Sequence, residues 1–403
     1  MGLIVQKFGG SSVANAEKVF NVASRVIDAY NEGNKVIVVV SAQGDTTDDL
    51  IEKAKEINPS PSKREMDMLL STGEQISISL LAMAIEKLGY PVVSLTGWQI
   101  GMKTDSSYGQ ARIKKIDAER LEMELDKNNI IVVAGFQGIN KYDDITTLGR
   151  GGSDTTAVAI AAALHADKCE IYTDVDGVYS TDPRIVPNAV KLEEITYDEM
   201  LELASLGANV LHNRSVEMAK KYHVKLEVKS SFEKIDGTVV KEEVKMEKML
   251  VRGVTRDNNV ARVAIVGVED QPGIAFKIFS LLGKKKINID IIIQSIGRDG
   301  TKDISFTVAE DALDEAIAVL EASKEDIKYR ELLTKKDVSK VSIVGAGMVN
   351  NPGIASKMFE ALYEASINIH MISASEIKIS VLVDQDMSEK AVKYIHDKFD
   401  FKA

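Results

Sequence analysis

Short runs of β-branched residues alternate with amphipathic stretches from the first residues to about position 230. Between the apolar runs lie helical patterns at Ala16–Asn31, Ser71–Leu88, Ala118–Lys127, Asp154–His165 and Asp198–Leu206. The candidate strands are Leu3–Gln6, Lys35–Val40, Pro91–Ser94, Ile130–Ala134, Cys169–Tyr172 and Val224–Val228. Apolar strands separated by helices are typical of a parallel sheet that is covered on both faces. The pattern therefore predicts an α/β fold, a three-layer sandwich with a mostly parallel central sheet.

An internal repeat begins after the charged stretch Lys241–Lys248. Val263-Ala264-Ile265-Val266-Gly267 returns as Val341-Ser342-Ile343-Val344-Gly345, and a Pro-Gly-Ile-Ala turn and an Ile-Asn-Ile segment return in the same order. Each copy has the pattern strand, Pro-Gly turn, helix, strand, strand, helix. This pattern predicts two small ferredoxin-like domains of βαββαβ type.

The second copy lacks a final strand. The first copy continues into a candidate strand at Ile327–Leu332, whereas the second ends with the helical segment Ser388–Lys398. The run Met249–Val254 has strand character and no other sheet to join, so we predict that it completes the second copy. The expected domains are 1–245, then 258–333 as an inserted first copy, with 246–257 plus 334–403 as the second copy.

Composition narrows the class of protein. A chain of 403 residues that is 45% hydrophobic predicts two or three domains with sizeable cores. The single cysteine, Cys169, excludes an intramolecular disulfide and favours a reducing compartment. No basic leader and no apolar segment of membrane-spanning length stands out, so we expect a cytoplasmic protein without a membrane partner. The net charge of −11 opposes binding to nucleic acid.

The loop Lys7–Ser12 is the first candidate for phosphate binding. No Walker-type loop and no G-x-G-x-x-G turn is present, so phosphate must be held in another way. Gly9 and Gly10 let backbone N–H groups approach an anion, Ser11 adds a hydroxyl group, and Lys7 adds a full positive charge. A Gly-Gly-Ser-Ser segment alone is more often only a turn, but a lysine directly after a first strand favours an anion site.

Two further loops have the same character. Leu148–Thr156 carries Arg150, whose planar fork suits a carboxylate, and Asp154, for which a helix N-cap is an equally good alternative. Thr173–Arg184 follows a strand and combines acids, a tyrosine and an arginine, where open α/β sheets bind their ligands. Each loop alone is consistent with an ordinary turn, and the three together indicate one site.

These loops, together with Ser71-Thr72-Gly73-Glu74, resemble the aspartate kinases, a branch of the amino-acid kinase superfamily. The resemblance extends over essentially the whole chain, and the repeat resembles the paired ACT domains of that family. It implies the amino-acid kinase fold and transfer of the ATP γ-phosphate to the β-carboxylate of L-aspartate. Because a carboxylate with a pKa near 4 is already ionised, no general base is needed. None of the five scattered histidines is expected to be catalytic.

The resemblance also implies roles for individual residues. Lys7 would stabilise charge on the phosphoryl group and Asp154 would orient Lys7 or the metal shell. MgATP would be bound by Lys7, Gly9, Gly10, Ser11, Thr173, Asp174, Tyr179 and Arg184. Aspartate would be bound by Ser41, Thr47, Glu74, Arg150, Ser153 and Asp154, with Arg150 on its α-carboxylate and Glu74 on its α-ammonium group. ATP oxygens and water would hold most of the Mg²⁺ shell, so no protein metal ligand is predicted.

Regulation is the last expectation from the resemblance. An amino-acid effector, lysine first and threonine second, would bind the ACT repeat of a dimer or dimer of dimers. The candidate contacts, for which simple turn and core positions are the alternative, are Asp270, Ile274, Ala275, Ile289, Asp290, Gln294, Asn368 and Ile369. One departure is Asn209, where relatives usually carry a lysine near the nucleotide, and we expect Arg184 to compensate. Asn213 similarly replaces a common proline.

Two other functions compete with this interpretation. One is a related kinase that acts on glutamate or acetylglutamate, against which the pairing of Glu74 with Arg150 suggests a free α-amino acid. The other is a non-catalytic amino-acid sensor, which would not need Lys7, Asp154 and the third loop together.

Overall fold

The computed structural model describes residues 2–207, 210–243, 250–295, 300–346, 348, 351 and 353–401. These residues form two compact units, and each is described by itself. The first unit contains the described residues within 1–179, 191–205 and 209–246. The second contains those within 180–190, 206–208 and 247–403.

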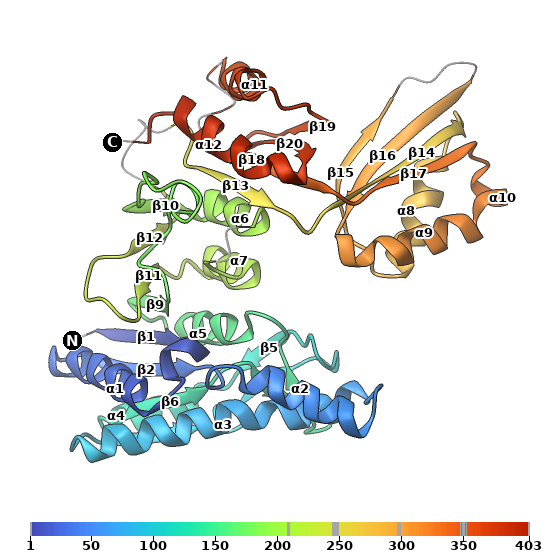
Figure 1. Cartoon of the computed structure of the whole chain (residues 1–403). Helices are drawn as coiled ribbons and strands as arrows, with labels where there is room; N and C mark the ends of the chain where they lie inside the picture. Colours follow the sequence, from blue (N-terminus) through green and yellow to red (C-terminus); the bar gives the residue numbers. More distant parts are fainter. Residues whose placement is uncertain are drawn as a thin grey trace. The chain divides into compact units, whose positions relative to one another are not determined.

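An eight-stranded sheet organises the first unit (Figure 1), with the strand order β10-β12-β11-β9-β1-β2-β6-β3. All neighbouring strands are parallel except β11 and β12, which confirms the predicted mostly parallel sheet. The strands are β1 Leu3–Phe8, β2 Lys35–Val40, β3 Val92–Leu95, β6 Ile130–Ala134, β9 Lys168–Thr173, β10 Glu194–Thr196, β11 Leu226–Ser230 and β12 Thr238–Lys241.

Helices cover both faces of this sheet. On one face, the cluster of apolar side chains formed with α1 and α3 includes Val36, Val38 and Val40 of β2. The alternate residue Ile37 is buried outside that cluster. Helix α5 packs on β1, β2 and β9 (Figure 1). The helices of this unit are α1 Ala16–Asn31, α2 Thr46–Ile57, α3 Lys63–Lys87, α4 Glu119–Asp126, α5 Gly152–Ala163, α6 Tyr197–Ser205 and α7 Asn213–Tyr222, with a short 3-10 helix η1 at Gly10–Val13. Period-two burial places the two helical layers on opposite sides of the strands, as a sandwich requires.

Several features of the first unit differ from the prediction. Helix α3 begins at Lys63 rather than Ser71, and α2, α7, β10 and β12 were not predicted. A small second sheet, β5-β4-β7-β8, was also missed; its strands are β4 Met102–Thr104, β5 Ile113–Ile116, β7 Gln137–Ile139 and β8 Ile145–Thr147. Helix α3 has the length and hydropathy of a membrane-crossing segment, but it packs on α1, β3 and β6 as a core helix.

The second unit contains two four-stranded antiparallel sheets, one for each copy of the repeat. The first copy has the strand order β15-β16-β14-β17 and the second β13-β18-β20-β19. The strands are β13 Gly253–Asp257, β14 Ala261–Glu269, β15 Ile289–Gln294, β16 Thr301–Val308, β17 Glu331–Lys335, β18 Val338–Val344, β19 Met371–Ala374 and β20 Lys378–Asp384. The helices are α8 Ile274–Lys284, α9 Leu313–Ala322, α10 Lys324–Ile327, α11 Ile354–Glu364 and α12 Ser388–Lys398.

Strand β13 pairs antiparallel with β18, at the edge of the second copy's sheet. It starts later than the strand expected at Met249–Val254, whose first residue lies outside the described part of the chain. Similarly, β17 is Glu331–Lys335 rather than the expected Ile327–Leu332, and Ile327 ends the helical turn α10 instead. The segment Ser180–Val190 also belongs to this unit, and Val186 is buried in the apolar cluster around β18 and α11.

Candidate active site

Parallel strands bring the first and third predicted loops, and the segment that follows β2, to one edge of the large sheet. The last residue of β1, Phe8, is in register with Val40 at the end of β2 and with Tyr172 near the end of β9. Thr173 is in turn paired with Ser230, the last residue of β11. The segments that follow β1, β2 and β9 therefore all start at the carboxyl edge, where α/β sheets bind ligands.

Lys7 and Asp154 form a buried ion pair at this edge. Lys7 is the penultimate residue of β1, and its Nζ lies 2.7 Å from Oδ1 of Asp154, with each side chain only 12% exposed. Asp154 is the third residue of α5, whose N-cap is Gly151, so the N-cap alternative for Asp154 is wrong. The pair places a cation and a carboxylate side by side at the carboxyl edge of the sheet.

The glycine loop packs closely on the segment that follows β2. A Cβ atom on Gly10 would lie 2.5 Å from the carbonyl oxygen of Ala42, and the N–H of Gly44 donates to the carbonyl of Gly10 at 3.0 Å. Only glycine tolerates this approach. Ser41 and Thr47, two predicted substrate contacts, lie on the segment that joins β2 to the first turn of α2. The first loop and the Ser41 segment thus form one wall of the site.

Glu74 of α3 brings a buried carboxylate to the same wall. Its side chain is 3% exposed, and Oε1 accepts a hydrogen bond from the N–H of Ala42 at 3.2 Å. Oε2 has no hydrogen-bond partner among the described residues. Burial raises the pKa of Glu74 to about 7. A carboxylate in this state is stabilised by a cationic ligand group, which would restore its charge.

The turn that carries Arg150 connects β8 to α5. Arg150 is exposed and its side chain forms no hydrogen bond or ion pair with the described residues, whereas Ser153 is buried against Gly135. Gly151 has a φ of +66°, and a Cβ atom there would overlap the ring of His212. Backbone geometry therefore fixes the position of Arg150 within the turn.

Three residues that support this turn were not predicted. Asp67 accepts hydrogen bonds from the N–H and hydroxyl group of Thr147. Burial raises the pKa of Asp67, although these hydrogen bonds act in the opposite direction. Arg214 donates to a backbone carbonyl group of the turn. His212 packs under Gly151, and burial lowers its pKa, so the ring is neutral. Nothing in the local sequence pattern marks these residues, because their partners are far away in the chain.

The residues predicted to bind nucleotide are only partly brought together. Thr173 and Asp174 follow β9 at the shared edge and are joined by a hydrogen bond of 3.0 Å. Tyr179 donates to Asp176, and burial followed by this bond raises the pKa of Tyr179 to about 12. Arg184 belongs to the second unit, where it forms an ion pair with Asp182 at 2.7 Å. Asn209, the predicted departure, lies outside the described residues.

The predicted effector residues lie in the second unit. The two acids among them already pair with lysines, Asp270 with Lys302 at 2.8 Å and Asp290 with Lys340. Ile274 and Ile289 contribute to the core of the first copy, Ala275 and Ile369 are partly buried, and Gln294 and Asn368 are exposed. The described residues contain no cluster of three histidine, cysteine or acidic side chains that would hold a metal ion.

Comparison with known proteins identifies the family. The amino acid kinase family model matches residues 2–230, and the ACT domain model matches 263–323 and 341–399. Aspartokinase from Bacillus sp. (strain MGA3) and aspartokinase 2 from Bacillus subtilis (strain 168) are each 53% identical over 401 residues, covering 99% of this chain and 98% of the relative.

Solved structures agree with this result. Aspartokinase III of E. coli in complex with aspartate and ADP has a TM-score of 0.83 at 25% identity, covering 98% of this chain and 99% of that chain. The same enzyme in complex with lysine and aspartate has a TM-score of 0.77. These matches confirm the predicted fold class. The chain therefore belongs to the aspartokinases, the aspartate-kinase enzymes of the amino acid kinase family.

Proposed function

We propose that the site transfers the γ-phosphate of MgATP to the β-carboxylate of L-aspartate by positioning and charge neutralisation. The buried pair of Lys7 and Asp154 at the carboxyl edge of the sheet is the observation that carries this mechanism. Lys7 neutralises charge that moves through the phosphoryl oxygens, and Asp154 holds its ammonium group in place. The already ionised substrate carboxylate needs no base.

The nucleotide phosphates are proposed to bind the first loop. The close packing of Gly10 on the Ser41 segment leaves the backbone of Gly9, Gly10 and Ser11 at the strand end, where N–H groups suit phosphate oxygens. Thr173, Asp174 and Tyr179 are the proposed contacts for the remainder of the nucleotide, together with Arg184. Because Asp154 is already paired with Lys7, most of the Mg²⁺ shell would come from ATP oxygens and water.

The amino-acid substrate is proposed to lie between Glu74 and Arg150. The carboxylate of Glu74 would accept the α-ammonium group, and the guanidinium group of Arg150 would bind the α-carboxylate bidentately. Ser41, Thr47 and Ser153 would line the pocket. The buried, incompletely paired carboxylate of Glu74 favours a free ammonium group over an acylated nitrogen, which argues against acetylglutamate as the substrate.

A coupled ADP-release assay with aspartate, glutamate and homoserine tests this function. We expect ADP release with aspartate only, and its loss in Lys7→Ala. Faster ADP release with glutamate than with aspartate would identify glutamate as the substrate instead. A Lys7→Ala variant as active as the parent would contradict the role of the ion pair.

The second unit is proposed to bind an end-product amino acid, lysine first and threonine second, in a cytoplasmic dimer or dimer of dimers that joins through the ACT repeat. The proposed domain limits are 1–245, 258–333, and 246–257 plus 334–403. The reaction would be the first step of lysine, threonine and methionine biosynthesis. Titration of each amino acid into the ADP-release assay tests the effector, and indifference to both would contradict feedback inhibition.

A further inference from the structure

Arg214, the second residue of α7, bridges two backbone segments near the proposed substrate site. Its Nη1 atom donates to the carbonyl oxygen of Leu148 at 2.7 Å, and Nη2 donates to the carbonyl oxygen of Ala111 at 3.0 Å. The guanidinium group is half-buried and forms no ion pair with a carboxylate in the described part of the chain. Burial, followed by repulsion from Arg112, lowers its pKa.

The two backbone segments joined by Arg214 also both donate hydrogen bonds to a second charged residue, Asp67. Asp67 of α3 accepts from the N–H of Thr147 and from the N–H of Gly109, both at 2.9 Å. The carboxylate of Asp67 thus binds N–H groups one residue before Leu148 and two residues before Ala111. Arg214 binds the carbonyl groups. Two charged side chains therefore fix the strand that enters the Arg150 turn.

Arg150 depends on this backbone support. Its side chain forms no hydrogen bond or ion pair with the described residues, so the turn determines where its guanidinium group starts. Leu148 is two residues before Arg150, and its carbonyl oxygen accepts the hydrogen bond from Arg214. A misplacement of about 1 Å at a group that orients the substrate can cost about 100-fold in rate.

The guanidinium chemistry of Arg214 suits a positioning role better than a purely structural one. A fork with two parallel N–H donors reaches two carbonyl groups at once, which an ammonium group does not reproduce. Burying a guanidinium group without a carboxylate partner is costly, and its positive charge would favour an anionic substrate nearby.

We propose that Arg214 is a positioning residue for the amino-acid substrate, acting through the Leu148–Gly151 turn on Arg150. This inference rests on the proposed function, in which Arg150 binds the α-carboxylate. It assigns to Arg214 a specific effect on aspartate rather than on ATP.

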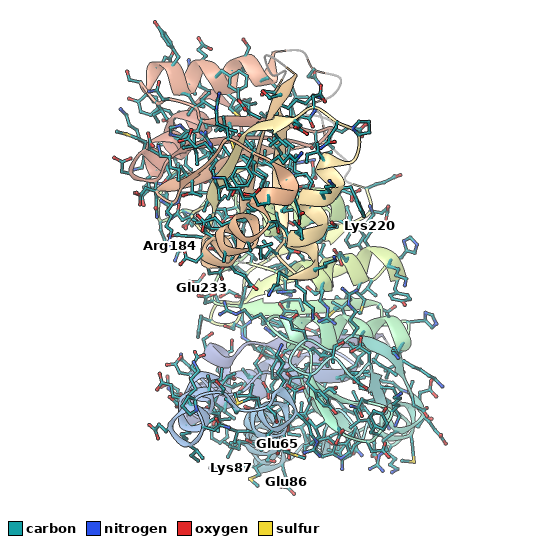
Figure 2. The ribbon with its side chains drawn as sticks, turned by 90° about the vertical axis from the view of Figure 1, so that its right-hand side faces the viewer. Glu65, Glu86, Lys87, Arg184, Lys220 and Glu233 are labelled. Carbon is teal, nitrogen blue, oxygen red and sulfur yellow. The ribbon has the colours of Figure 1, made fainter. Side chains whose placement is uncertain are left out.

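The test is a double-mutant cycle in the full-length protein. Arg214→Met should raise KM for aspartate about tenfold or more and leave KM for ATP within about twofold. In an Arg150→Gln background, Arg214→Met should add less than about twofold, because the residue it positions is already lost. Arg214→Lys, which keeps the charge and one hydrogen bond, should give an intermediate KM. Lys220→Met is the control, since Lys220 lies on the same helix in an exposed ion pair with Asp198 (Figure 2).

Several outcomes would overturn the inference. One is an unchanged KM for aspartate in Arg214→Met, and another is an equal rise in KM for aspartate and for ATP. A third is a double variant in which the effects of Arg150→Gln and Arg214→Met on KM for aspartate multiply. If Arg214→Met does not fold, Arg214→Lys carries the test through the same ratio of KM values. A parent protein without aspartate-dependent ADP release would contradict the proposed function instead, and calorimetric binding of aspartate to the parent and Arg214→Lys would then still report on positioning.

Discussion

Glu74 links the stability of the first unit to its proposed substrate site. Its side chain is 3% exposed and accepts one hydrogen bond, and burial raises its pKa from the ordinary value of 4.5 to about 7. Replacing this carboxylate with the neutral amide in Glu74→Gln keeps the shape and an acceptor for the N–H of Ala42. The substitution should therefore stabilise the protein at the pH where it impairs aspartate binding.

The direction of the pH dependence follows from proton linkage. Between pH 4.5 and 7 the unfolded chain has released the Glu74 proton while the folded chain retains it. The free energy of unfolding therefore falls as the pH rises through this window, and the contribution of Glu74 is fully present only below pH 4.5. The interval of about 2.5 between the two pKa values corresponds to about 3 kcal/mol. We expect Glu74→Gln to be more stable than the parent by about this amount at pH 8, and by much less at pH 5.

Urea unfolding followed by tryptophan fluorescence measures this difference in the free energy of unfolding, and it reports on the first unit of the protein. Trp98 is the only tryptophan of the chain, and it lies between β3 and β4 of the first unit. Glu86→Gln is the matched control, because Glu86 is exposed on the same helix as Glu74 (Figure 2). Equal stabilisation by Glu74→Gln at pH 5 and pH 8, or the same pH dependence in the control, would refute the reasoning.

Three further predictions concern the site and its regulation. Lys7→Met should lower kcat about 100-fold or more with little change in KM for aspartate, because Lys7 acts on the transition state, and an intact kcat in the ADP-release assay would contradict this role. Gly151→Ala should lower the melting temperature and raise KM for aspartate, because the added methyl group would overlap the His212 ring. Gly33→Ala is the control: Gly33 has a φ of +86° and open space around it, so this substitution should change the free energy of unfolding by only about 1 kcal/mol. Lysine should inhibit at lower concentration than threonine, and the reverse order in dose–response curves would change the effector.

The large sheet was predictable because its central strands are continuous apolar runs. Lys35–Val40 and Ile130–Ala134 were predicted with the bounds that the structure shows. The strands of the small sheet have only three or four residues, too few for a periodic pattern. The early start of α3 had a local signal, since Ser62 followed by Glu65 matches the capping-box sequence and the Ser62 hydroxyl accepts from the N–H of Glu65.

Lys7 and Glu74 could be named as candidate site residues because each lies in a recognisable local segment, and their roles stay predictions. The supporting residues could not be named, because their partners are distant in the chain. Arg214 binds carbonyl groups that are 66 and 103 residues away, and Asp67 binds Thr147 across 80 residues. Helix phase and strand order decide such contacts, and neither has a signature in the residues around Arg214 or Asp67.

The partners of the two buried carboxylates fit the proposed binding of two differently charged substrates at one site. Asp154 already has a cation, because Lys7 lies 2.7 Å away, so its charge does not repel an incoming phosphate. Glu74 has only an N–H donor, and its raised pKa shows that its environment does not compensate a negative charge. An ammonium group that enters beside Glu74 would restore that charge and gain an ion pair in a dry environment. In the proposed mechanism, the pairing of Asp154 and the lack of a cationic partner at Glu74 would thus separate the polyanionic substrate from the amino group of the amino-acid substrate.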